Sequence, residues 1–431
     1  MQTSLIQNAH GDLVTDAAYD FYGIRLATCS LDHRIRIWQI DESDGTWTAV
    51  ADWKAHDAAV TKLSWAHPEF GSVLASSSFD RTVKVWEEIP ADSADQPQAN
   101  GASTASNGPG TRWIERAVLA DAKGSVRAVE FAPHQFGLKF ATIASDNHLR
   151  VYECLEAPTL TNWTLVEEAD VPALPSTSTS HPHTYAAPTP TQVSGTPAAD
   201  VSLVANALQQ QQQQPPMQRG AGSREADGGW SVSWCKERYW GEVLATCSGV
   251  NGVVKIIQLS PSRRPVTLLS LDPSPSGDSG SIPEDGTVPY AITSVAWAPS
   301  CGRSYHLVAA GGRDGHVRIW RLRPSSLDEE RMEGTDEAKW MGSIVADFDH
   351  HKSSVGRVEW NITGTVLSSA GNDGRIRLWK ATTGNIWRPQ DTSRLSKRRS
   401  NKRRVTSKWM TITLQNENIP TVLLFVPWSL R

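Results

Sequence analysis

The sequence predicts an all-β protein, a six-bladed β-propeller, and two observations support this prediction. A short pattern recurs along the chain, in which two strand-like runs are joined by a turn and end in an aromatic residue. Each copy follows another run in which apolar and polar residues alternate, which is the period of a half-buried strand. Repeats of this kind are typical of propellers, where each repeat builds one four-stranded blade.

Four copies of the pattern are clear and two are weaker. The clear copies cover residues 26–38, 74–86, 307–320 and 367–379, and the weaker ones cover 140–152 and 244–257. The alternating runs that come first include 60–71, 126–137, 292–302 and 355–364, and outer strands are expected after Trp38 and at 113–120. We therefore expect a propeller over residues 8–388.

Three copies carry four side chains at the spacing of the WD-repeat tetrad. In that tetrad an aspartate accepts a hydrogen bond from a histidine, the histidine bonds a hydroxyl, and the hydroxyl accepts from an indole N–H, so that buried polar groups satisfy one another. The three sets are His10, Thr28, Asp32 and Trp38; His56, Ser76, Asp80 and Trp86; and His351, Ser369, Asp373 and Trp379. Their role is predicted to be structural.

The other three copies lack parts of the tetrad. Tyr152 and Ile257 replace the tryptophan, Ala310 stands where the hydroxyl belongs, and Asn251 replaces the aspartate. We expect blades three, four and five to depend more on apolar packing.

A Ser-His-Asp set also suggests a hydrolase, but the repetition argues against that interpretation. A catalytic triad is one geometric site, whereas these residues recur three times, and no G-x-S-x-G elbow accompanies them. No phosphate-binding loop or metal-ligand spacing is present, and the five cysteines are far apart and odd in number. The sequence predicts no catalytic residue, cofactor, metal site or small-molecule substrate. The cysteine pattern predicts a reducing compartment.

Spacing and composition predict insertions within the propeller and a separate tail. The closing aromatic residues are farther apart than the usual blade period of about 40 to 45 residues. The excess falls in polar, low-complexity segments at about 91–111, 172–229 and 272–288, which are expected to be disordered. Residues 389–431 are expected to be a disordered basic tail, in which the basic run 394–408 is a candidate nuclear localisation signal or an unstructured cationic stretch.

Charge and hydropathy restrict the classes of partner. The formal net charge is −4, but residues 388–431 hold ten Lys or Arg against two Asp or Glu, which leaves the body at −12. Such an acidic body does not suit nucleic-acid binding, for which a basic surface is typical. No signal peptide or transmembrane run is evident, so an intracellular soluble protein is expected.

Several turns resemble those of the SEH-type nucleoporin family. The matching segments are DFYGIRLATCSLD at 20–32, SWAHPEFGSVLASSSFDRTVKVWEE at 64–88, EFAPHQFGLKFATIASDNHLRVYE at 130–153, WAPSCGRSYHLVA at 297–309 and EWNITGTVLSSAGNDGRIRLWK at 359–380. The related Sec-thirteen coat protein shares a similar opening and WAHPxFG turn. Three short sequences favour the SEH type over the coat protein: YDFYG at 19–23, GRSYH at 302–306 and the NITGT turn at 361–365.

The resemblance implies a scaffold subunit of the Y-shaped nuclear pore subcomplex at the nuclear envelope, supporting protein and mRNA transport. It implies an open propeller completed by a blade from an α-solenoid nucleoporin, and also a role in a vacuolar SEA-type complex in TOR signalling. An exposed sheet edge between blades one and six gives an independent reason to expect strand addition. A closed six-bladed ring, a Sec-thirteen-type coat subunit, and a substrate adaptor of a ubiquitin ligase or chromatin complex remain alternatives.

Overall fold

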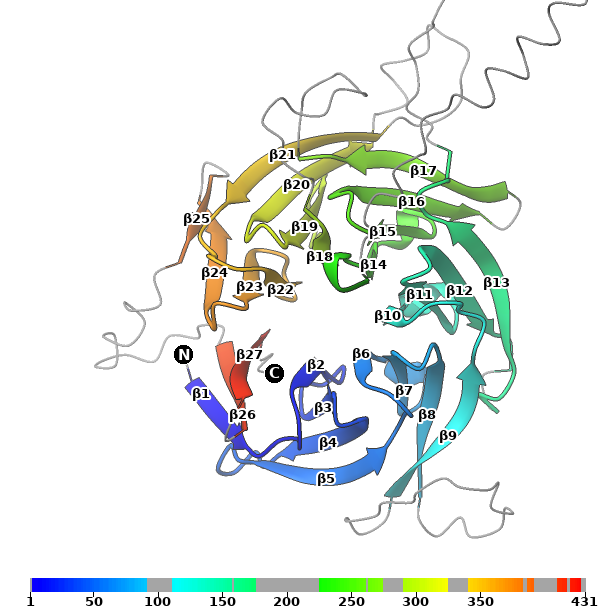
Figure 1. The fold of residues 1–431 in the computed structure, drawn as a ribbon, viewed down its shortest axis with the longest axis vertical. Coiled ribbons are helices and arrows are strands. Elements are labelled where there is room, and N and C mark those ends of the chain that lie inside the picture. The colour runs from blue at the N-terminus through cyan, green and yellow to red at the C-terminus, as the bar shows by residue number, and fades with distance from the viewer. Residues whose placement is uncertain are drawn as a thin grey trace, which may run out of the picture.

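The protein folds into six four-stranded sheets arranged around a common centre (Figure 1). The computed structural model describes residues 2–90, 111–156, 159–175, 225–260, 263–273, 290–324, 340–382, 386–390, 409–416 and 419–427. In every sheet, four strands that are consecutive in the chain pair antiparallel, with the first strand innermost. The prediction of a six-bladed β-propeller is confirmed.

The blades follow one another in chain order. Blades one to three comprise β2 (Val14–Tyr19), β3 (Arg25–Ser30), β4 (Arg34–Ile40), β5 (Trp47–Lys54); β6 (Val60–Trp65), β7 (Val73–Ser78), β8 (Val83–Pro90), β9 (Thr111–Leu119); and β10 (Val126–Phe131), β11 (Lys139–Ala144), β12 (His148–Cys154), β13 (Trp163–Asp170). Blades four to six comprise β14 (Ser231–Trp234), β15 (Val243–Cys247), β16 (Val254–Ser260), β17 (Arg263–Leu271); β18 (Ile292–Trp297), β19 (His306–Gly312), β20 (Val317–Pro324), β21 (Trp340–Phe348); and β22 (Val355–Trp360), β23 (Val366–Gly371), β24 (Ile376–Ala381), β25 (Trp387–Pro389). Four single-turn 3₁₀ helices lie at Pro68–Phe70, His134–Phe136, Glu225–Asp227 and Arg238–Trp240.

Residue size explains where each strand lies. The second strands β7, β15 and β19 consist mainly of small and aliphatic residues and are buried throughout, because the faces of a blade pack against its neighbours. The outer strand β13, in contrast, alternates between half-buried and exposed side chains along most of its length. The hydrophobic core is therefore a series of layers between adjacent blades.

One of these layers contains a buried histidine. His306, at the start of β19, is 3% exposed, and its ring lies 5.5–5.7 Å from the rings of Trp240, Trp297 and Trp340. Its Nδ1 is buried and has no hydrogen-bond partner among the described residues. Burial lowers the pKa of His306 to about 4, and the nearby positive charge of Arg303 adds to this effect.

A three-stranded sheet stands between blades six and one (Figure 1). We call it the closing sheet: β1 (Gln2–Gln7) pairs parallel with β26 (Trp409–Asn416), which pairs antiparallel with β27 (Ile419–Pro427). β26 and β27 lie within 389–431, for which the sequence predicts a disordered basic tail. Both are rich in β-branched and apolar residues, and the ends of the six-bladed array offer them a place to pack.

Most of the other segments expected to be disordered lie outside the described residues. This holds for 91–110, 176–224 and 274–289, which include most of the three predicted insertions, and for the basic run 394–408. At the border of the second insertion, Glu225–Asp227 forms a single-turn 3₁₀ helix.

The buried His306 makes the stability of the propeller depend on pH. In the unfolded chain this imidazole titrates near 6.5, whereas in the folded protein its pKa is about 4. Acidification through this window therefore protonates the unfolded state first, and stability present above pH 6.5 is lost progressively as the pH falls towards 4.

We expect His306→Phe to remove roughly 3 kcal/mol of this pH dependence between pH 7 and pH 4, because phenylalanine fills the same space without titrating. Denaturant unfolding at several pH values measures the effect. An unchanged dependence on pH in the variant would contradict the assignment.

Candidate functional site

The structure brings the four members of each predicted tetrad together. In blade one, His10 Nδ1 lies 3.1 Å from an Asp32 carboxylate oxygen, its Nε2 lies 2.8 Å from the Thr28 hydroxyl, and the Trp38 indole donates to that hydroxyl at 2.9 Å. In blades two and six the corresponding distances are 2.8, 2.8 and 2.9 Å, and 3.2, 2.8 and 2.9 Å. The three networks therefore share one geometry.

This geometry suits a structural role and not acyl transfer. Thr28 and Ser76 are 0% exposed and Ser369 is 1% exposed, so a substrate carbonyl has no path to any of the three hydroxyls. Each hydroxyl oxygen already accepts from an indole, which occupies one of its two lone pairs and lowers its nucleophilicity. Burial alone would raise the pKa of Asp32, but the hydrogen bond from His10 and its charge lower it to about 2.

Blades three and five satisfy their aspartates in another way. Arg150 donates to Asp146 at 2.8 Å, and Arg318 donates to Asp314 at 2.5 Å, in each case from four residues further along the chain. Arg150 is 1% exposed, so its charge is buried with that of the carboxylate. The expectation that these blades depend more on apolar packing therefore omits an ion pair. The D-x-x-x-R spacing alone does not indicate it, because Asp32 and Arg36 have the same spacing and Arg36 pairs with Asp52 instead.

Within the described residues, His67, Glu69 and His134 form a group with metal-ligand side chains. The two imidazole rings stack at 4.0 Å with an angle of 20° between their planes. A histidine binds a metal through a lone pair that lies in the ring plane, so two nearly parallel, stacked rings do not direct their nitrogens at one ion. His67 Nδ1 also accepts the Glu69 backbone N–H at 3.3 Å. The arrangement does not fit a metal site.

The ring gap, between blades six and one, is the candidate interaction site. Its inner rim is bridged by the carboxylate of Asp16 on β2, which accepts from Arg357 on β22. The same carboxylate accepts from Lys62 Nζ at 3.2 Å and from the Leu63 backbone N–H at 3.0 Å on β6. Asp16 is 3% exposed. One buried charge therefore joins blades six, one and two.

Outside that rim, the ring gap is filled by strands from the two ends of the chain. β27 is the innermost strand of the closing sheet and contacts β2 of blade one and β23 of blade six. β1 reaches the ring gap through the short segment that leads into blade one, whereas the hairpin of β26 and β27 follows a long connection after β25. The hairpin is thus the separable part of the closing sheet.

The cysteines and the hydropathy of the helices bear on the expected compartment. All five cysteines are free, and burial raises the pKa of Cys235 to about 11 and of Cys247 to about 12, so these thiols are inert at neutral pH. Among the described residues no helix is long and apolar enough to cross a membrane.

Comparison with known proteins places the chain among propeller-forming nucleoporins. The family model "WD domain, G-beta repeat" matches residues 2–39, 47–87, 283–321 and 342–380. The chain is similar to Nucleoporin SEH1 of Saccharomyces cerevisiae, 31% identical over 410 residues that cover 88% of this chain and 95% of the relative. It is 33% identical to Nucleoporin SEH1 of Homo sapiens, over 88% of this chain and 84% of that protein, and 30% identical to Nucleoporin seh1 of Schizosaccharomyces pombe, over 90% and 95%.

Removing one tetrad hydroxyl tests the structural role. Ser76→Ala leaves His56 Nε2 and Trp86 Nε1 buried without their partner. We expect it to lower the free energy of unfolding by about 2 kcal/mol. Thr48→Ala, at an exposed hydroxyl on β5, should cost less than about 0.5 kcal/mol. Urea denaturation of both variants gives the comparison. Esterase activity of the parent protein that disappears in a folded Ser76→Ala variant would show that the structural assignment is wrong.

Removing the charge at the inner rim tests the bridge across the ring gap. Asp16→Asn keeps the shape and can keep the bond to the Leu63 N–H. It removes the buried counter-ion that Lys62 and Arg357 share and leaves Arg357 with only the partly exposed carboxylate of Glu359 at 3.2 Å among the described residues. We expect a loss of about 3 kcal/mol in the free energy of unfolding. Asp52→Asn, which breaks the outer ion pair with Arg34 (2.7 Å), should cost less than about 1 kcal/mol. Equal losses of unfolding free energy in the two variants would mean that the Asp16 bridge stabilises the fold no more than an outer ion pair does.

Proposed function

The chain belongs to the SEH1 family of nucleoporins, and we propose that it is a non-catalytic scaffold subunit of the nuclear pore complex, located at the nuclear envelope. The observation that carries the proposal is the ring gap: six complete blades leave a space that strands from outside the six-blade array fill. In this proposal the tetrads stabilise the blades, and the protein supports protein and mRNA transport by holding its partners in place.

The proposed partner is an α-solenoid nucleoporin that supplies strands to the ring gap, as part of the Y-shaped subcomplex. The closing sheet supports this, because it demonstrates that the space accepts a sheet three strands wide. β1 already lies there and offers one edge for a partner hairpin. Since the hairpin of β26 and β27 occupies the remaining two positions, the partner strands would have to displace it.

The relatives' names refer to nucleoporins, and the proposal is confined to the pore. No observation favours the vacuolar assembly, the coat subunit or the ubiquitin-ligase and chromatin adaptor over it. Affinity purification of the tagged protein followed by mass spectrometry separates these alternatives. Recovery of pore-scaffold subunits supports the proposal. Vesicle-coat subunits, or cullin or histone-modifying subunits without nucleoporins, would replace it.

A deletion of residues 391–431 tests whether the tail hairpin competes with the partner. A tethered segment competes at an effective concentration on the order of millimolar. We therefore expect the shortened protein to recover roughly tenfold more of the solenoid nucleoporin than the full chain does, measured by quantitative mass spectrometry at equal bait levels.

The control for this deletion is Ser4→Pro in the full chain. Ser4 pairs with Ile412 in the closing sheet, and proline removes a backbone N–H from β1. If β1 supports the partner strands, combining Ser4→Pro with the deletion should reduce the recovery again. Loss of the partner on deletion alone would show instead that the tail is part of the interface.

A further inference from the structure

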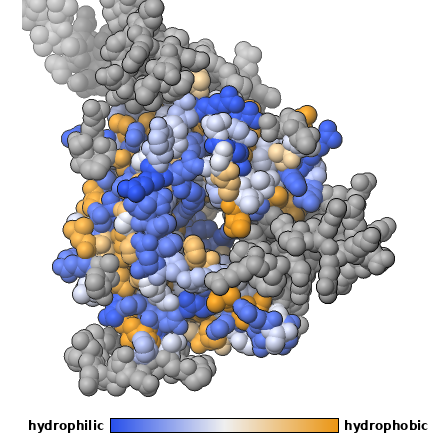
Figure 2. Space-filling model, turned by 180° about the vertical axis from the view of Figure 1, so that it is seen from behind, coloured by the Kyte–Doolittle hydropathy of each residue, from blue (hydrophilic) through white to orange (hydrophobic). Residues whose placement is uncertain are grey.

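The inner strands of the six blades enclose a channel, and the channel contains a cavity of about 250 Å³. Figure 2 shows the opening near the middle of one face, with strongly hydrophilic residues inside. Two equivalent positions in each blade line the cavity. The first position is occupied by Thr15, Thr61, Arg127, Trp230, Thr293 and Gly356, and the second by Asp16, Lys62, Ala128, Ser231, Ser294 and Arg357.

At the first position, threonine ties neighbouring blades together. The Thr15 hydroxyl donates to the Val60 carbonyl at 2.5 Å, Thr61 donates to Val126 at 2.7 Å, and Thr293 donates to Val355. Each bond runs from one blade to the first residue of the next inner strand. Blade six has Gly356 at this position, and in blades three and four Arg127 and Trp230 take the place of threonine. A blade gives up an inter-blade hydrogen bond there and gains a charge or an aromatic ring facing the channel.

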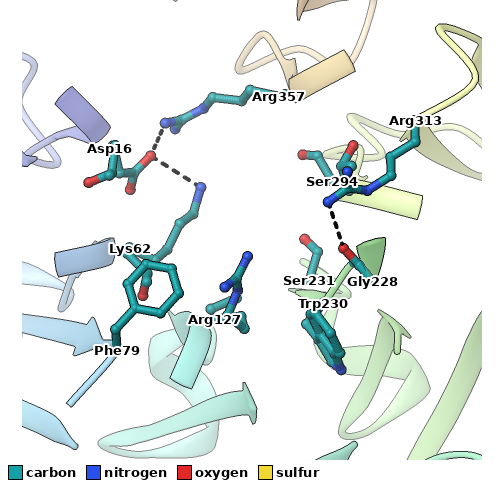
Figure 3. A pocket seen from close by; sticks show the side chains of 16 residues that line it. Asp16, Lys62, Phe79, Arg127, Gly228, Trp230, Ser231, Ser294, Arg313 and Arg357 are labelled. Carbon is teal, nitrogen blue, oxygen red and sulfur yellow. Dashed lines mark hydrogen bonds and ion pairs between the residues drawn. The ribbon is translucent and has the colours of Figure 1, made fainter. Parts of the chain in front are cut away.

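Arg127 is held between two aromatic rings. Its guanidinium carbon lies 4.6 Å from the Phe79 ring centroid of blade two and 5.5 Å from that of Trp230, within the range of cation–π attraction. The Trp230 ring is itself fixed by a hydrogen bond from its Nε1 to Asn147 at 2.8 Å. In Figure 3 the Arg127 side chain rises between these rings towards the middle of the cavity. The guanidinium is therefore positioned in advance, at little entropic cost to a ligand.

The donors of Arg127 are not used by any of the residues that the structure describes. In the described ranges its guanidinium makes no hydrogen bond, and its nearest carboxylate is that of Glu225 at 3.7 Å, a side chain that is 45% exposed. Burial lowers the pKa of Arg127, and the like charge of Arg313 lowers it further. The negative charge of Glu225 acts in the opposite direction and raises this pKa. The described surroundings of the Arg127 guanidinium thus hold too little negative charge to balance its positive charge.

Three more cations line the same cavity. Lys62 and Arg357 share the single carboxylate of Asp16. Arg313 has no carboxylate of its own and donates to the backbone carbonyls of Ala226 and Gly228, while its buried Nε has no partner among the described residues. Four cations therefore face one buried carboxylate, that of Asp16, and two partly exposed ones, those of Glu225 and of Glu359, which pairs with Arg357 at 3.2 Å.

We propose that the channel mouth binds an acidic side chain of an extended peptide, with Arg127 as the bidentate anchor for its carboxylate. The flat guanidinium fork matches a carboxylate in two parallel hydrogen bonds. The cavity of about 250 Å³ has room for such a head group. The acidic body would repel the continuous charge of a nucleic-acid backbone, whereas a single carboxylate reaches this local cluster of cations. The site shares Asp16, Lys62 and Arg357 with the inner rim of the ring gap. Its anchor Arg127 lies on blade three, so binding does not need a strand-donating partner.

Fluorescence anisotropy with the full-length chain tests the proposal. The probe is a short, capped, fluorescein-labelled peptide that alternates glutamate and serine, and its control replaces every glutamate by glutamine. We expect the glutamate peptide to bind, the glutamine peptide to fail, and Arg127→Gln to weaken binding by roughly tenfold or more. Arg127→Lys should fall between, because it keeps the charge but loses the fork.

Arg388→Gln on β25 is the matched control, since it removes the same charge from an exposed position on the outer strand of blade six. It should leave binding unchanged. Equal weakening by Arg388→Gln and Arg127→Gln would reduce the effect to overall electrostatics and overturn the proposal. If Arg127→Gln does not fold, as judged by its thermal transition, Arg313→Gln replaces it with the same expectation. A phosphoserine peptide or a single-stranded oligonucleotide that binds through Arg127 where the glutamate peptide does not would overturn the assignment to a carboxylate.

Discussion

The fold depends on closing a ring, and the buried carboxylate of Asp16 is where the inner rim closes. A propeller blade is stable only when both of its faces are covered, so the first and last blades must meet or find another sheet. Here Asp16 accepts from Arg357 of blade six and from Lys62 and Leu63 of blade two. The outer part of the ring gap is too wide for two blades to touch, and the closing sheet covers it. The inner rim of the ring is therefore closed by the Asp16 ion pairs, and the outer part by the closing sheet.

The repeating part of the fold could be predicted because its signals are local. Each blade is built from consecutive strands, and in blades one, two and six the tetrad residues lie within about one repeat length of one another. The closing sheet could not be predicted in this way. Its pairing joins Gln2 to Met410 across the whole chain, and the basic run before β26 led to one interpretation for the entire tail. The insertions fall mainly outside the described residues and stay predictions.

The channel shows a second limit of the sequence pattern. Arg127 and Trp230 each follow the blade repeat in their own strand, so nothing local distinguishes them from a solvent-facing substitution. Their significance comes from a comparison of equivalent positions across six blades, four of which carry threonine or glycine. The same is true of Arg150 and Arg318, which replace the histidine of the tetrad as partners of an aspartate. Once the six-bladed ring is known, the residues that differ from those at the equivalent positions of the other blades indicate where a specific interaction lies.

The parallel pairing of β1 with β26 has a consequence for biosynthesis. A ribosome releases β1 first and the hairpin of β26 and β27 last, so the six blades can assemble while the strand beside them has no intramolecular partner. During that interval the edge of β1 is open to strands from another chain. After release, the same strands would have to displace a tethered competitor. The order of synthesis thus gives a co-translational partner a kinetic advantage over one that arrives later.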